Sequence, residues 1–312
     1  MKQTLGGALS RRDNALNFVR LTLATAVVLG HAWTLGGFEE SAVAGLRDWA
    51  VNGFFAISGY LIAGSRMRLN LGPYLWRRAL RILPAFYVCL IVTAFVIAPL
   101  STLISGEHYD FASGVGYVVR NAGLYMVQWG IDDTLLAVPY EQVWNGSLWT
   151  LFYEFLAYIA AGLLLVVPFA RRHAVVVVAA VFIAVVAFRP LAYGPLDVTT
   201  NLYLNSARLG AYFLAGMLIY FLRDRIRVRG WLPLVALALL VGLGLAGWAE
   251  WAAQLPLAFL VIWGGRFCRS GSARPTTSPT ACTSGRSRCS RSSRLPEWSG
   301  WGRGAPPCSR WR

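Results

Sequence analysis

The chain has 312 residues, of which 56% are hydrophobic and only 14% are charged, and its formal net charge is +15. A soluble domain carries about a quarter charged residues, so this composition excludes an ordinary soluble protein and indicates a multi-pass membrane protein. The long apolar stretches lack strand-like alternation and are separated by short, Arg-marked loops, which favours an all-α, polytopic transmembrane helical bundle over a β-barrel.

Eight apolar segments are long enough to cross the roughly 30 Å of hydrocarbon in a bilayer. In chain order they are residues 16–36, 49–64, 82–104, 147–168, 173–188, 202–222, 231–248 and 251–264. The first segment is too long for a removable signal peptide, and no small-residue cleavage site follows it. We therefore interpret it as the first crossing.

Residues 111–128 form a weaker candidate because Arg120 and Asn121 stand in their middle. Lys and Arg near the ends of spans stay on the cytoplasmic side of a membrane. If this segment does not cross, all the Arg-rich loops fall on one side and most acidic loops on the other. We therefore predict an interfacial or re-entrant segment, about eight spans, and a cytoplasmic N-terminus in the cell inner membrane.

A change in composition divides the chain into a membrane-embedded domain, 1–265, and a basic tail, 266–312. The tail holds ten Arg and one Glu, a net of +9, so the overall positive charge does not predict a nucleic-acid partner. It is rich in Ser, Pro and Cys, has no Cys spacing that suits zinc, and is typical of a disordered segment. GC-rich coding DNA that is translated out of frame also yields many Arg and no Lys. We therefore interpret the tail as the product of a frameshift.

Three ionisable residues in the apolar spans are candidates for chemistry, because charge inside hydrocarbon is costly and tends to mark function. His31 lies in the outer half of the first span, and Glu154, about 10 Å inside the fourth, is expected at a similar depth. The two can then pair, since a carboxylate tunes an imidazole as a general base. Arg208 is expected to neutralise Glu154 or to steady an oxyanion. A structural histidine and a structural ion pair are the alternatives.

A second set of candidates is cationic. Arg78 and Arg81 lie one turn apart on one helix face, and paired guanidinium groups suit phosphate oxygens. Arg20 precedes His31 by eleven residues, which places the two on one helix face roughly 16 Å apart. It can join the same patch at the cytoplasmic end. An ordinary positive-inside anchor is the alternative.

Four motifs follow one another between residues 17 and 158. They are an Arg and a His separated by ten residues (Arg20, His31), FFAISGYLI, the pair Arg78 and Arg81 followed by Pro84, and SLWTLFYEFLAY with Glu154 in its acidic position. This set resembles the membrane-bound acyltransferase type 3 family, which O-acylates bacterial surface glycans, lipid-linked sugars and some antibiotics. The family has about ten spans, so the resemblance implies that this chain lacks the last two.

The resemblance implies an integral membrane O-acyltransferase that moves an acyl group, first of all acetyl, from acyl-CoA to a hydroxyl of a carbohydrate or lipid-linked glycan. His31 would be the general base, Glu154 would orient it, Arg20, Arg78 and Arg81 would hold the donor phosphates, and Arg208 would contact substrate. No bound cofactor, metal or nucleic acid is expected; the partners are acyl-CoA, the glycan and the bilayer. The alternatives are a proton-coupled transporter or flippase, in which His31 and Glu154 relay protons, and an inactive truncated acyltransferase.

Overall fold

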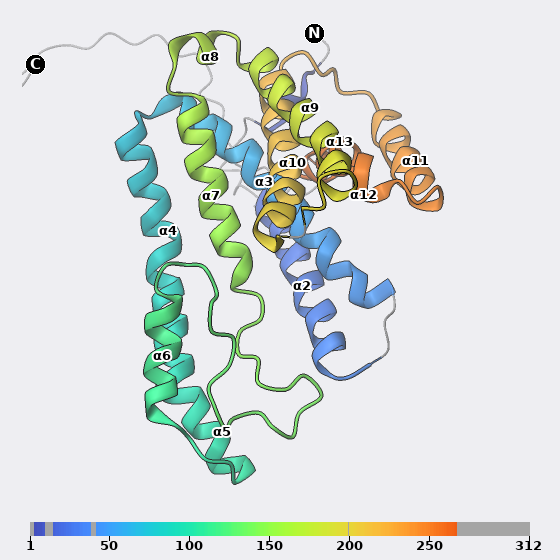
Figure 1. Cartoon of the computed structure of the whole chain (residues 1–312). Helices are drawn as coiled ribbons and strands as arrows, with labels where there is room; N and C mark the ends of the chain where they lie inside the picture. The colour runs from blue at the N-terminus through green and yellow to red at the C-terminus, as the bar shows by residue number, and fades with distance from the viewer. Residues whose placement is uncertain (1–2, 10–14, 39–41, 199, 267–312) are drawn as a thin grey trace, which may run out of the picture. The chain divides into compact units, whose positions relative to one another are not determined.

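The computed structural model describes residues 3–9, 15–38, 42–198 and 200–266, and within these residues every regular element is a helix. The predicted tail, 266–312, lies outside the described residues except for Arg266. Figure 1 shows how the helices are arranged. They are α1 (Leu5–Leu9), α2 (Leu16–Leu35), α3 (Ala42–Arg68), α4 (Leu71–Val92), the π-helix η1 (Thr93–Ile97), α5 (Ala98–Ser105), α6 (Phe111–Asn121), α7 (Trp149–Leu164), α8 (Pro168–Arg172), α9 (Ala174–Tyr193), α10 (Asn201–Leu222), α11 (Leu232–Leu245), α12 (Ala249–Ala252) and α13 (Gln254–Gly264).

Each predicted span contains a helix, so the all-α membrane fold is confirmed. Among the described residues, α2, α9 and the continuous stretch Leu71–Ser105 are long and apolar enough to cross a membrane by length and composition. The stretch Leu71–Ser105 comprises α4, η1 and α5, and it begins eleven residues before the predicted span. The number of crossings and their orientation stay predictions.

The weak candidate at 111–128 is helical only as far as Asn121. α6 has 11 residues, which at 1.5 Å each span about 16 Å, too short for the roughly 30 Å of hydrocarbon. The Asn121 side chain then turns the chain: its oxygen accepts from the N–H groups of Val127 and Gln128, and its amide donates to the Gln128 carbonyl. The polar Asn121 therefore ends α6 within this apolar segment. A helix that stops here agrees with a segment that does not cross the membrane.

α3 and α10 form the central crossing of the bundle, and two glycines allow their close approach. A Cβ on Gly59 of α3 would collide with the carbonyl of Phe213, and a Cβ on Gly216 of α10 would collide with the carbonyl of Ala56. Small residues let membrane helices bring their backbones together. The small residues of FFAISGYLI therefore serve packing, as predicted, and α3 can place side chains toward α2, α7, α10 and α13.

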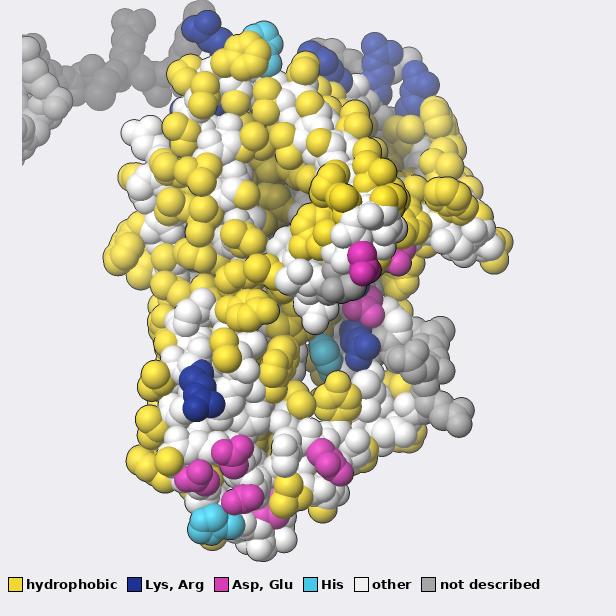
Figure 2. Space-filling view, viewed as in Figure 1, with side chains coloured by type: hydrophobic (Ala, Val, Ile, Leu, Met, Phe, Trp, Pro, Cys, Tyr) yellow, Lys and Arg dark blue, Asp and Glu magenta, His cyan; other side chains and the backbone are white. Residues whose placement is uncertain are grey.

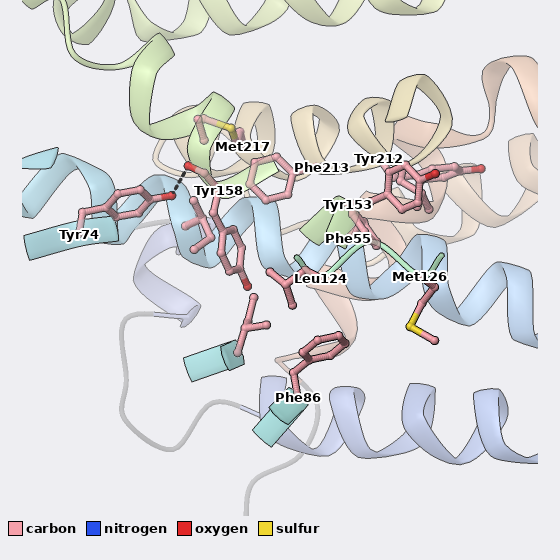
Figure 3. Close-up of a cluster of buried hydrophobic side chains, with 14 of the residues drawn as sticks. Phe55, Tyr74, Phe86, Leu124, Met126, Tyr153, Tyr158, Tyr212, Phe213 and Met217 are labelled. Carbon is pink, nitrogen blue, oxygen red and sulfur yellow. Dashed lines mark hydrogen bonds between the residues drawn. The ribbon is translucent and has the colours of Figure 1, made fainter. Parts of the chain in front are cut away.

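The main hydrophobic core lies between α3, α4, α7 and α10 (Figure 3). Tyr158 of α7 is buried there beside Phe213 of α10, with ring centroids 6.3 Å apart. The hydroxyl of Tyr74 on α4 donates to the backbone carbonyl of Tyr158 at 2.9 Å. This hydrogen bond fixes α4 against α7 and so holds the Arg residues of α4 next to that helix.

Charges are unequally distributed between the two ends of the bundle. Figure 2 shows most Lys and Arg side chains at the end where α8 lies and a group of Asp and Glu side chains at the opposite end, where α5 lies. We name these the basic end and the acidic end. α2 runs in the direction from the basic end toward the acidic end (Figure 1), so Arg20 lies nearer the basic end than His31 does.

Candidate functional site

His31 faces a large cavity at the acidic end. The cavity has a volume of about 780 Å³ and is lined by His31 from α2, by Arg47 and Asp48 from α3, and by Thr150 from the first turn of α7. The rest of the wall comes from further residues of α2, α3 and α7 and from the non-helical segment between α6 and α7. His31 is therefore available to a substrate that enters this cavity, which a histidine enclosed within the bundle would not be.

The non-helical wall, residues 122–148, is held by hydrogen bonds rather than by secondary structure. The Glu107 carboxylate accepts from the backbone N–H groups of Leu136 and Leu135 at 2.8 and 3.0 Å and from the Ser105 hydroxyl. These hydrogen bonds, that from Leu136 first, lower the pKa of Glu107 below its usual value. The side chains that this segment presents to the cavity are Trp129, Tyr140, Val143, Asn145 and Ser147.

Asp48 is the carboxylate that interacts electrostatically with His31. It also contacts two guanidinium groups, Arg47 at 3.7 Å and Arg208 at 3.8 Å. Arg47 donates to the hydroxyl of Thr34 on α2 at 3.0 Å, which ties the ends of α2 and α3 together around the cavity. Sequence reasoning missed Asp48, although an acidic residue at the edge of a predicted span was a usable signal.

Glu154 lies at a different level from His31. Its carboxylate accepts from the Ser58 hydroxyl at 3.1 Å and from the Tyr158 hydroxyl, and it interacts electrostatically with Arg20. No contact among the described residues joins it to His31, so the expected pairing is not found.

The reason is visible along α3, where Asp48 and Ser58 stand ten residues apart, about 15 Å of helix. Asp48 interacts with His31, and Ser58 bonds Glu154. The depth argument took Ser147 as the surface, whereas Ser147 itself lines the cavity at the level of His31.

Arg208 was expected to neutralise Glu154 or to steady an oxyanion, with a structural ion pair as the alternative. Its ion pair is with Asp48, and it lines a second cavity together with Asn52 and Tyr212. The oxyanion role stays a prediction. The residue does lie in the part of the bundle that contains His31, because Asp48 interacts with both. Arg208 thus lies close to Asp48, the carboxylate that interacts with His31.

Arg20, Arg78 and Arg81 come together around Tyr158, and we call them the guanidinium cluster. Arg20 interacts electrostatically with Arg81 and Tyr158. The guanidinium of Arg78 lies 5.9 Å from the centre of the Tyr158 ring and donates to the Ser65 hydroxyl at 3.1 Å. These three residues therefore lie near one another, and Glu154 is the carboxylate beside them. Their role in holding the donor phosphates stays a prediction.

A further buried charge, Arg189, was overlooked in the sequence. Arg189 is only 1% exposed, and its guanidinium donates to the backbone carbonyl and the carboxylate of Glu250 at 2.9 and 3.1 Å. A cation directly after the apolar run 174–188 was the available signal. Within the described residues, no group of three or more His, Cys, Asp or Glu could hold a metal ion.

Comparison with known proteins gives two findings. The model of a family described as an acyltransferase domain matches residues 13–268. An O-acetyl transferase of the Shigella phage Sf6 is 33% identical over 157 residues, which is 48% of this chain and 45% of that protein. The chain thus spans less than half the length of this curated relative. No solved structure matches the chain.

Proposed function

The chain belongs to the acyltransferase 3 family, and from that premise we propose that it is an O-acyltransferase that moves an acyl group from acyl-CoA to a carbohydrate hydroxyl. Acetyl is the acyl group that the phage relative's name supports. The observation that carries the proposal is the arrangement along α2, where Arg20 meets the guanidinium cluster and His31 meets the large cavity. The single helix α2 thus carries both a residue of the proposed anion site and the proposed general base.

The guanidinium cluster suits the phosphates of coenzyme A. Arg20, Arg78 and Arg81 converge near Glu154, so the positive charges of the cluster exceed its negative charge. Guanidinium groups bind phosphate oxygens through paired, charge-assisted hydrogen bonds. Arg81 is exposed and Arg78 is partly exposed, which leaves their donors available to a ligand.

His31 is the proposed general base on the acceptor. It takes the proton of the acceptor hydroxyl while that oxygen attacks the thioester carbonyl carbon. The bond between this carbon and sulfur then breaks, the acyl group stays on the acceptor oxygen as an ester, and the proton passes from His31 to the coenzyme A thiolate. No other reactant is needed.

Asp48 and Glu154 act as positioning residues in this proposal. Asp48 favours the imidazolium that forms on His31 and so offsets part of the stronger, opposing effect of Arg47. Glu154 holds Arg20 and orders the hydroxyls of Ser58 and Tyr158 between the two ends of the site. Glu154 was first expected to orient His31 directly. The proposal no longer assigns it that role, because its hydrogen bonds are with Ser58 and Tyr158.

The proposal also fixes an orientation. Acyl-CoA is a cytosolic donor, so the basic end with the guanidinium cluster faces the cytoplasm and the His31 cavity faces the opposite side of the inner membrane. The gathering of Arg at one end and of Asp and Glu at the other supports this, because Lys and Arg flank cytoplasmic span ends.

The test is acyl transfer by the full chain in membrane vesicles. Labelled acetyl-CoA is supplied with bacterial glycolipid extract, and released thiol and labelled ester are both measured. We expect His31→Ala to lower transfer about 100-fold or more, the usual contribution of a general base. His108→Ala, in an exposed loop, is the matched control and is expected to transfer normally.

Normal transfer by His31→Ala would overturn the assignment of the base. Wild-type vesicles that consume no thioester but carry out proton-coupled flux would overturn the enzyme proposal in favour of a transporter. Equal expression and equal thermal stability of the two variants must accompany either result.

A further inference from the structure

A second, smaller cavity lies beside the His31 cavity on the other side of α3. Its volume is about 200 Å³, well above the roughly 10–15 Å³ that one buried water needs. The lining side chains come from three helices: Trp49 and Asn52 of α3, Arg208 and Tyr212 of α10, and Ala249 and Glu250 at α12. The mechanism proposed above makes no use of this cavity.

Two buried polar atoms at this cavity have no hydrogen-bond partner within the described residues. They are the side-chain oxygen of Asn52, a residue that is 7% exposed, and Nε of Arg208. The Asn52 side chain also hydrogen-bonds Tyr212, which fixes its position in the wall. A buried polar atom left unsatisfied costs about 1–3 kcal/mol, so buried polar groups nearly always have partners. One acceptor and one donor thus belong to residues that line the same cavity.

The charges around the cavity are matched in pairs. Arg189 is bonded to Glu250 at 3.1 Å, and Arg208 lies 3.8 Å from Asp48. An anion would therefore meet no excess of positive charge here, in contrast to the guanidinium cluster. A hydroxyl can both donate and accept a hydrogen bond, which is what the Arg208 and Asn52 atoms require. Trp49 adds an aromatic wall against which the apolar face of a ring can pack.

We propose that this cavity is the acceptor subsite and that it binds a neutral, polyhydroxylated ring, one sugar unit of the acceptor. The inference rests on the proposed function, and it identifies the part of the site that selects the acceptor. Asp48 and Val51 of α3 line the His31 cavity, whereas Trp49 and Asn52 line this one. A sugar bound here lies next to the cavity in which His31 takes the hydroxyl proton.

Sugar binding by the full chain tests the proposal directly. Methyl glycosides of glucose, galactose, mannose and rhamnose are the probes, and saturation-transfer NMR in a detergent without a sugar headgroup is the measurement. We expect at least one glycoside to bind the wild type and to bind about tenfold more weakly, or ~1.4 kcal/mol, to Trp49→Ala and Asn52→Leu. Trp231→Ala, which removes an exposed indole just before α11, is the matched control and is expected to bind normally.

His31→Ala separates this inference from the proposed function. It is expected to bind the glycoside normally even though its acyl transfer is lowered about 100-fold or more. Equal binding by wild type, Trp49→Ala and Asn52→Leu overturns the subsite, as does absence of binding by the wild type. Displacement of the glycoside by inorganic phosphate overturns the neutral-ligand assignment. Because Trp49 is partly exposed, Trp49→Ala is expected to fold and keeps the test decisive if Asn52→Leu does not.

Discussion

At the scale of single residues, the Arg side chains of the bundle differ in how many of their N–H donors have hydrogen-bond acceptors within the protein. Arg66 is buried and donates to the backbone carbonyls of Gly162 and Leu69 at 3.0 and 2.8 Å, so it joins α3 to α7 and to the start of α4. Arg78 donates to one hydroxyl and has a buried Nε without a partner in the described residues. The first arrangement serves stability, whereas the second leaves donors for a ligand.

This difference predicts the effect of removing Arg78. We expect Arg78→Ala to raise the KM for acyl-CoA about 10-fold to 100-fold, the loss of one or two hydrogen bonds to a charged group, while kcat changes little. The measurement is the rate of thiol release at varied acyl-CoA concentration. Arg77→Ala is the matched control, because Arg77 is the neighbouring, exposed cation and is not part of the guanidinium cluster.

Arg78→Lys refines the test, because it keeps the charge and removes the planar fork. An intermediate KM indicates that the fork itself binds phosphate. If Arg77→Ala and Arg78→Ala raise the KM equally, the cluster acts only as a general positive field, and the specific role of Arg78 is wrong.

At the scale of elements, the α3 and α10 crossing determines where the functional side chains lie. α3 supplies Asp48 to the imidazole, Ser58 to Glu154 and Asn52 to the smaller cavity. α10 supplies Arg208 to the same smaller cavity. These positions hold only while the two backbones stay in contact at Gly59 and Gly216.

A substitution pair within α10 tests this dependence. Gly216→Ala places a methyl group against the Ala56 carbonyl, and we expect a loss of about 1–3 kcal/mol of stability from overpacking. A Cβ on Gly210 meets open space, so Gly210→Ala is expected to leave stability unchanged or slightly raised. Thermal unfolding followed by size-exclusion chromatography in detergent measures both variants. Equal melting temperatures would show that the crossing is not tight at Gly216.

The segment 122–148 depends on Glu107, and this gives a pH dependence. The folded pKa of Glu107 is lowered, first of all by the N–H donor of Leu136, so its contribution to loop stability is present above the unfolded pKa and is lost as the pH falls through the lower folded pKa. The protection factors of the Leu135 and Leu136 amides, which compare their exchange rates with the intrinsic rate at each pH, are expected to be high at pH 7 and lower in acid. Glu107→Gln should remove the difference; a pH response that persists in Glu107→Gln would assign it to another group.

At the scale of the whole molecule, the sequence predicts the helices well and their lateral contacts poorly. Apolar runs, Arg20, His31 and the pair Arg78 and Arg81 are recognisable because hydrocarbon imposes a strong pattern on composition. Which side chains of neighbouring helices meet depends on helix rotation and on the α3 and α10 crossing, which no spacing within one segment encodes. For this reason the pairing of Glu154 with His31, and of Arg208 with Glu154, could not be judged from depth alone.

The separation of charge between the two ends gives the last prediction, the orientation of the bundle. With the five native cysteines changed to serine, Asp132→Cys marks the acidic end and Arg225→Cys the basic end, both at exposed positions. We expect a membrane-impermeant maleimide to label Asp132→Cys in intact spheroplasts and Arg225→Cys only after permeabilisation, because Arg-rich loops remain in the cytoplasm. The opposite labelling would place the guanidinium cluster outside the cell. Cytosolic acyl-CoA could not reach it there, and the assignment of the donor would be wrong even if the helices are arranged as described.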